Sequence, residues 1–328
     1  MINVLHRFSA LPILILLAAS SLTSIASAQA EVYITKASRT IMLNDFGVTT
    51  VTDVMTIANS GATPLETLVV GFPKAYSKNL ELFEVRGRTG EVLKVERIVD
   101  ESSPTYWLRC RFGQPVSAGG TYEIRVSSIF SSLVSFDGRE YTLSFSAYPT
   151  LQVRAESYNS TVIMPKGASP RGWPNQTYVK SAADGKPALT GSKKPLQPLS
   201  DTGFSLKYSN EAQTLLSFKS IWREIDIMPD GNVHSSDTYR VTNLGKELNS
   251  ITIPCPKNVS PIGLYDTAGP IHEKLKAQKD TISITPRFSM LTKGSSFTFR
   301  LEYDLPSQDS LRRLDPLGSY KFVGELAR

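Results

Sequence analysis

The feature that most constrains this chain is an alternation of apolar and polar residues with a period of two. It is clearest at residues 121–130, 141–145 and 296–303. A period of two places successive side chains on opposite faces, so each segment is predicted to be a strand with one solvated face. No long segment shows the helical period. The sequence therefore indicates an all-β protein.

Turn signals separate these strands at short intervals. Asp137-Gly138 and Asp230-Gly231 lie between alternating segments, where glycine supplies the positive φ that hairpin turns need. One short helix is expected after Ser307, with Leu311 and Leu314 on the same face. Many short strands with almost no helix favour antiparallel β-sandwiches over a parallel α/β sheet.

A sequence pattern occurs twice with matched spacing. The matched residues are Arg39, Gly47 and Asn59 in the first copy and Arg223, Gly231 and Asn243 in the second. Each copy continues into an apolar strand that ends at a proline, a turn with threonine and glycine, and a glycine turn before a strongly alternating strand. Any two sandwiches share some of this, but the matched spacing favours an internal duplication. Repetition alone carries no chemistry.

The composition shifts between residues 165 and 200, where prolines and glycines are frequent and periodicity is lost. This stretch is either an insertion in the first domain or the linker itself. Alternation resumes at 204–208. We assign residues 29–209, with the insertion, to the first β-sandwich domain and 210–328 to the second. The second is expected to be incomplete, because residues 320–323 resemble the start of a strand.

The first 28 residues have the three-part layout of a secretory signal peptide. Arg7 is followed by an apolar run at 11–19 and then by the small-residue pattern Ala26-Ser27-Ala28. The run is short for a membrane span, although a retained N-terminal anchor is the alternative. No other run reaches spanning length. We expect export to the lumen of the endoplasmic reticulum or to the extracytoplasmic face of the cell membrane.

The charge pattern argues against nucleic acid as a partner. The net charge is +6, and lysines and arginines are scattered among acids. There is no basic stripe interleaved with aromatic residues. Short basic pairs such as Lys193-Lys194 are typical of solvated faces, with attraction to anionic lipid or phosphorylated ligands as the alternative.

Catalytic patterns are weak throughout the sequence. His234 is followed by Ser235, Ser236 and Asp237, but neighbours on a strand point to opposite faces and do not make a triad. We find no metal-ligand spacing, phosphate-binding loop or nucleophile elbow. We therefore predict no catalytic, metal-binding or cofactor-binding residue, and no small-molecule cofactor.

Covalent modification is the remaining kind of site. Sequons begin at Asn159, Asn175 and Asn258, which an exported protein can carry as N-glycosylation sites. The chain has two cysteines, Cys110 and Cys255. Alternation places Cys110 on the buried face of a strand. The two cysteines are either joined by a disulfide or are separate thiols, and the second interpretation is the simpler one.

A series of short motifs follows in order along the mature chain. They are Arg39-Thr40, Tyr148-Pro149-Thr150, residues 217–225, Gly231-Asn232-Val233, Pro286-Arg287-Phe288, Lys293-Gly294, Tyr303-Asp304-Leu305-Pro306-Ser307, and Leu311 with Leu314. Their order and spacing resemble the lumenal region of the ribophorin I family, over nearly the whole mature chain. That family has a membrane anchor after its lumenal domains, which this chain lacks, so we expect an anchor beyond Arg328. The turn at 314–318 is also longer than the family pattern.

The resemblance implies a non-catalytic accessory subunit of an oligosaccharyltransferase-like complex for protein N-glycosylation. Its role would be structural or would guide acceptor chains, and the chemistry would belong to a multi-spanning catalytic subunit. Membrane association would come through that partner or through the missing C-terminal anchor. The alternatives are a secreted or cell-surface binding or adhesion module of tandem sandwiches and, with least support, a hydrolase that uses His234.

Overall fold

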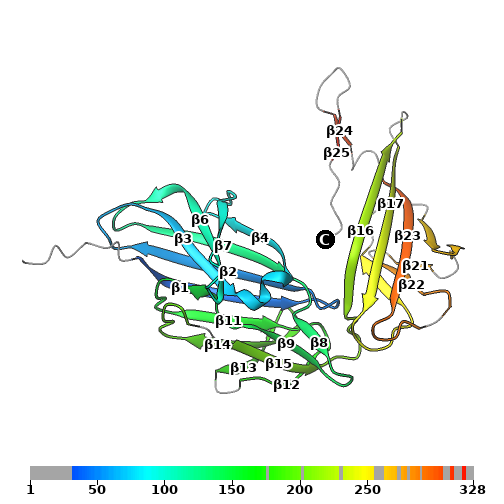
Figure 1. Ribbon diagram of the computed structural model, residues 1–328, viewed down its shortest axis with the longest axis horizontal. Coiled ribbons are helices and arrows are strands. Elements are labelled where there is room, and N and C mark those ends of the chain that lie inside the picture. Colours follow the sequence, from blue (N-terminus) through cyan, green and yellow to red (C-terminus); the bar gives the residue numbers. More distant parts are fainter. Residues whose placement is uncertain are drawn as a thin grey trace, which may run out of the picture.

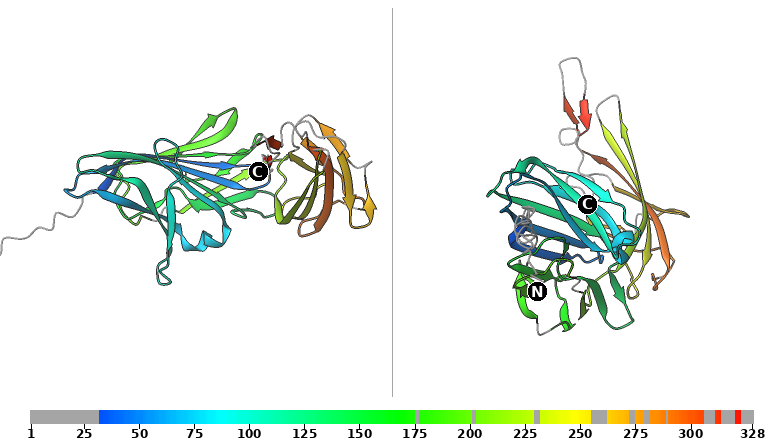
Figure 2. Two further views of the ribbon diagram at one scale, coloured as in Figure 1. Left: turned by 90° about the horizontal axis from the view of Figure 1, so that it is seen from above. Right: turned by 60° about the vertical axis from the view of Figure 1, so that its left-hand side comes forward.

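The computed structural model shows a chain built almost entirely of β-strands (Figures 1 and 2). The residues it describes are 32–174, 177–200, 203–228, 232–254, 262–271, 275–278, 281–288, 290–305, 311–313 and 320–322. The expected signal peptide at 1–28 lies outside this part. Within the described residues, no helix is long and apolar enough to cross a membrane.

A seven-stranded sheet forms the centre of the first unit. Its strands in spatial order are β13 (Tyr178–Ala183), β14 (Lys186–Lys193), β11 (Tyr158–Ile163), β1 (Val32–Leu43), β2 (Thr49–Asn59), β7 (Thr121–Phe130) and β4 (Leu80–Arg86). The alternation at 121–130 and 141–145 is confirmed, because these residues form β7 and β9. Each has one buried face.

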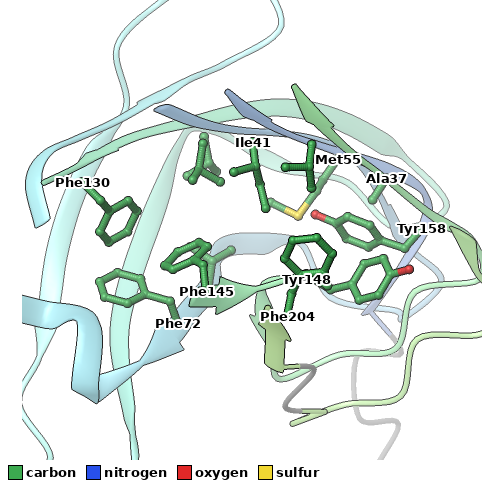
Figure 3. Close-up of a cluster of buried hydrophobic side chains, with 14 of the residues drawn as sticks. Ala37, Ile41, Met55, Phe72, Phe130, Phe145, Tyr148, Tyr158 and Phe204 are labelled. Atoms are coloured by element: carbon green, nitrogen blue, oxygen red, sulfur yellow. The ribbon is translucent and has the colours of Figure 1, made fainter. Parts of the chain in front are cut away.

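Two four-stranded sheets complete the first unit. One is β10 (Thr150–Leu151), β3 (Leu65–Pro73), β6 (Thr105–Val116) and β5 (Lys94–Ile98), and the other is β12 (Ser169–Gly172), β15 (Gly203–Ser209), β9 (Tyr141–Ser146) and β8 (Val134–Phe136). A 3-10 helix, η1 (Lys74–Asn79), follows β3. Aromatic side chains from several of these strands meet in one core, as Figure 3 shows for Phe72, Phe130, Phe145 and Tyr158.

The second unit has a separate core between two smaller sheets. One is β16 (Leu216–Ile227), β17 (Val233–Asn243), β23 (Ser296–Leu305), β19 (Ile262–Asp266) and β20 (Gly269–Pro270), and the other is β18 (Ile251–Pro254), β22 (Thr281–Ile284) and β21 (Leu275–Gln278). A short hairpin, β24 (Leu311–Arg313) and β25 (Tyr320–Phe322), follows.

The two units have the same strand order in their matching parts. The order β1-β2-β7-β4 in the first corresponds to β16-β17-β23-β19 in the second, and β3-β6-β5 corresponds to β18-β22-β21. The register also agrees, because Arg39 lies opposite Asp53 and Arg223 lies opposite Asp237. Both first hairpins carry a register shift near the start of the leading strand.

Three expectations need correction. The pairing is not antiparallel throughout, because β1 and β11 run parallel over Ala37–Met42 and Tyr158–Ile163. The stretch 165–200 is not a linker between the domains, because it supplies β12, β13 and β14 to the sheets of the first unit. Leu311–Arg313 do not begin a helix but form β24, since they pair with β25 and the hairpin overrides the helical spacing of Leu311 and Leu314.

The two units meet where the segment after β15 runs into β16. Leu215 belongs to the first core and Leu216 to the second. Phe46, in the turn of the first hairpin, packs edge-on against Phe218 at 5.9 Å between ring centroids. The ammonium of Lys293 donates a hydrogen bond to the carbonyl of Phe136 at 2.6 Å. The units are therefore in contact at the turn of the first hairpin and at β8.

Candidate functional site

The first hairpin of the first unit is centred on a buried ion pair. Arg39 Nε and Nη2 donate to Asp53 Oδ1 and Oδ2, each at 2.8 Å, and Arg39 Nη1 donates to the carbonyl of Ser146. Tyr158 Oη, from β11, donates to Asp53 Oδ1 at 2.7 Å. Burial alone would lower the pKa of Arg39, but the Asp53 carboxylate raises it above the ordinary value. Two buried charges are tolerated here because they pair with each other and each has a further hydrogen-bond partner.

The second unit places the same pair at the matching position but completes it differently. Arg223 Nε donates to Asp237 Oδ1 at 2.6 Å. Tyr303 Oη and Tyr239 Oη donate to Asp237 Oδ2, at 2.7 and 3.2 Å. Burial acts to raise the pKa of Asp237, but Arg223 and the tyrosine hydroxyl outweigh it, so the pKa lies below the ordinary value. These contacts join β16, β17 and β23, so the ion pair stabilises the first hairpin of the second unit.

The side chain of His234 makes its contact on the opposite face of the sheet from those of Ser235 and Asp237. Its Nδ1 lies 2.9 Å from Asp304 Oδ1 on the outer face of the sheet. Ser235 is buried on the other face, where its hydroxyl donates to Asp237. The structure thus separates His234 from Ser235 and Asp237, which lie together on the buried face. In the described part of the chain, no three His, Cys, Asp or Glu side chains gather as a metal site.

The modification sites are only partly within the described residues. Asn159 is exposed on β11, pointing away from the core. Asn175 and Asn258 lie outside the described residues, as does Cys255. Cys110 is buried on β6 as the alternation predicted, and burial raises the pKa of its thiol to about 12. The sequons and the disulfide therefore stay predictions.

A shallow groove of about 440 Å³ lies on the outer face of the second unit's larger sheet. Its floor comes from Thr238, Thr298 and Arg300, and its wall is the turn between β19 and β20. The guanidinium of Arg300 stacks 4.8 Å from the ring centre of Tyr265. Arg287 braces the turn, with Nε donating to Asp266 Oδ2 at 2.9 Å. These groups can bind a polar ligand by hydrogen bonding and stacking.

The outer edge of β16 is the most unusual surface of the second unit. Trp222 is 71% exposed, and Ile221 and Ile227 are each more than half exposed. Sequence reasoning missed this surface, although the isoleucines at alternate positions 221, 225 and 227 were a visible signal. That alternation is typical of a buried face, and the structure leaves it largely uncovered.

These features define a class: an all-β protein of two matching units, with buried ion pairs in its hairpins and an open strand edge. The family model for ribophorin I matches residues 32–250, which is more than half of the chain. The chain therefore belongs to the ribophorin I family, as the sequence motifs predicted. Proteins of this family are components of oligosaccharyltransferase.

Solved structures show only distant similarity to the chain. An M1 zinc metallopeptidase from Deinococcus radiodurans is 11% identical with a TM-score of 0.35, covering 62% of this chain and 46% of that one. Yeast LTA4 hydrolase is 8% identical with a TM-score of 0.35, covering 61% and 30%. A putative protease from Parabacteroides distasonis is 9% identical with a TM-score of 0.32, covering 55% and 41%. This chain thus spans less than half the length of each. No curated protein matches it.

Proposed function

We propose that this protein is a non-catalytic accessory subunit of an oligosaccharyltransferase-like complex for protein N-glycosylation. The observation that carries the proposal is the ribophorin I match over residues 32–250, which spans the whole first unit and the first hairpin of the second. In this assignment the transfer chemistry belongs to a multi-spanning partner subunit. This chain contributes a structural body or a guide for acceptor chains.

The side chains that dominate the interior support a scaffold role. In the first unit, hydrogen bonds join the charged and polar side chains of Arg39, Asp53 and Tyr158 to one another. In the second unit, they join Arg223, Asp237 and Tyr303 in the same way. A general base must instead keep a lone pair directed at a substrate. The matching strand order and register further support an origin of the two sandwich-like units by internal duplication.

The proposed location is the lumenal or extracytoplasmic side of a membrane. The layout of residues 1–28 supports export through a signal peptide. The outward position of Asn159 supports its use as a glycan acceptor. Membrane attachment would then come from the partner subunit or from an anchor of its own.

Co-purification tests this function directly. The full chain, carrying an affinity tag, is expressed in its host, membranes are extracted in a mild detergent, and bound proteins are identified by mass spectrometry. We expect a multi-spanning glycosyltransferase subunit in stoichiometric amount. Recovery of the chain alone would contradict the proposal. Release into the medium without detergent would instead favour the alternative of a secreted binding module, for which the Tyr265–Arg300 groove is the supporting observation.

A further inference from the structure

The outer edge of β16 corresponds to a strand edge that is closed in the first unit. In the first unit, Ala37–Met42 of β1 pair in parallel with β11, and the backbone N–H of Ala37 donates to the carbonyl of Ser157 at 3.0 Å. By the shared register, residues 221–226 of β16 occupy the matching positions. β16 is the last strand of its sheet in the described part of the chain (Figure 1).

Three of the four core-facing side chains at residues 221–227 are isoleucines, and two of these isoleucines are more than half exposed. Ile221, Ile225 and Ile227 lie opposite Tyr239, Ser235 and Val233, so they point to the face that packs on the second core. Ile221 is 56% exposed and Ile227 is 54% exposed. The matching side chains Ala37, Ile41 and Leu43 are buried almost completely. The second unit therefore has the apolar face of an inner strand at the edge of its sheet.

Natural edge strands are usually short, or protected by proline, bulges or inward-pointing charges. β16 is 12 residues long and contains no proline. Its one register shift lies between Phe218 and Ser220, before the exposed stretch begins. The one core-facing charge, Arg223, is neutralised by Asp237 at the hairpin's own ion pair. Glu224 and Asp226 lie on the other face, so apart from Arg223 the core-facing side of this edge is left without these protections, as expected of a strand that accepts another strand.

The ion pairs indicate which side chains an added strand would supply. In the first unit, the strand that closes the edge contributes the Tyr158 hydroxyl to Asp53. In the second unit, Asp237 already accepts hydrogen bonds from Arg223, Ser235, Tyr239 and Tyr303. An added strand therefore needs no hydroxyl at the matching position. It needs apolar side chains at alternate positions, to cover the three isoleucines.

We infer that residues 221–226 of β16 bind an extended segment of a partner polypeptide by strand addition, with apolar side chains of that segment packed over Ile221, Ile225 and Ile227. The parallel β1–β11 pair is the template. A second copy of this chain would pair β16 with itself about a two-fold axis, which requires an antiparallel arrangement. Strand addition gains its affinity from backbone hydrogen bonds and its selectivity from alternate side chains. The inference does not depend on the proposed function.

A peptide-binding measurement on the full chain tests this inference. The probe is a fluorescent peptide of residues 156–165 of this same chain with Tyr158→Val, because that strand already pairs with the matching edge. Its affinity is measured by fluorescence anisotropy. A peptide of the same composition with the alternation scrambled is the control ligand, and we expect it to bind at least about tenfold more weakly.

Two matched variants of β16 locate the binding. By the register of Ala37, the N–H of Ile225 points outward, so Ile225→Pro removes an edge donor without removing a bond to β17. Glu224→Ala, on the other face, leaves the edge intact. We expect Ile225→Pro to raise the Kd about tenfold or more and Glu224→Ala to change it less than about twofold. Circular dichroism establishes that both variants are folded.

Four outcomes would overturn the inference. One is the absence of peptide binding by the unmodified chain, and another is equal binding by Ile225→Pro and Glu224→Ala. The third is a dimer in sedimentation velocity that Ile225→Pro dissociates, because a second copy would then be the occupant. Binding by Ile221→Lys with unchanged affinity would also contradict it, since that charge would lie under the added strand.

Discussion

The first hairpins of the two units share their register and their central ion pair but differ in what surrounds them. β1 lies between β2 and β11, so Arg39 and Asp53 are sealed inside the first unit. Among the described residues, β16 has a strand on one side only, and the side chain of Arg223 is 16% exposed. The comparison teaches that one backbone pattern can serve as an inner strand or as an edge. The neighbouring strand decides which.

The largest expected effect comes from removing the arginine of each pair. Arg39→Ala leaves Asp53 buried with only Tyr158 as a partner, and should lower the free energy of unfolding by about 3–5 kcal/mol. Arg223→Ala should lower the free energy of unfolding clearly less, because Asp237 keeps three hydroxyl donors. Urea unfolding followed by fluorescence measures both. Equal losses would show that the surroundings do not matter.

The second comparison concerns matching isoleucines. Ile41 is fully buried, so Ile41→Ala should lower the free energy of unfolding by about 2–5 kcal/mol. Ile227→Ala removes a side chain that is more than half exposed, and should cost less than about 1 kcal/mol. Thermal unfolding by circular dichroism gives both values. A large loss for Ile227→Ala would mean that this side chain is already covered, and would weaken the strand-addition inference.

The smallest expected effect is a dependence of stability on pH in the second unit. Folding lowers the pKa of Asp237, so the folded state favours its carboxylate. The resulting stability is fully present above the ordinary aspartate pKa and is lost as the pH falls through the lower folded value. Denaturant midpoints measured from pH 7 down to pH 2 should show this loss. In Asp237→Asn the corresponding fraction of the acid dependence should be missing, and an unchanged profile would contradict the assignment.

Local patterns predicted the strands well because one face of each is solvated. The alternation at 121–130 and 296–303 predicted β7 and β23, and the burial of Cys110 followed from the same rule. The Pro/Gly-rich stretch misled because proline is tolerated at sheet edges and bulges. Pro170 lies next to a register shift in β12, which is an edge strand.

The site depended on contacts that sequence spacing does not encode. Arg39 and Arg223 were found by their repetition, but Asp53 and Asp237 were not, because the length of the turn in each hairpin decides which residue lies opposite. Tyr158 reaches Asp53 from 105 residues away through a parallel strand that no local pattern predicts. The exposure of the isoleucines on β16 likewise depends on which strand lies beside it.

The contact of Phe46 with the second core joins the first hairpin of one unit to the first hairpin of the other. The turn that closes the first hairpin rests on Phe218, and the backbone N–H of Leu216 donates to the carbonyl of Phe46. A force applied to β16 would therefore act on the first hairpin through these contacts. A partner bound along β16 would lie on a strand whose first residues contact the turn of the first hairpin.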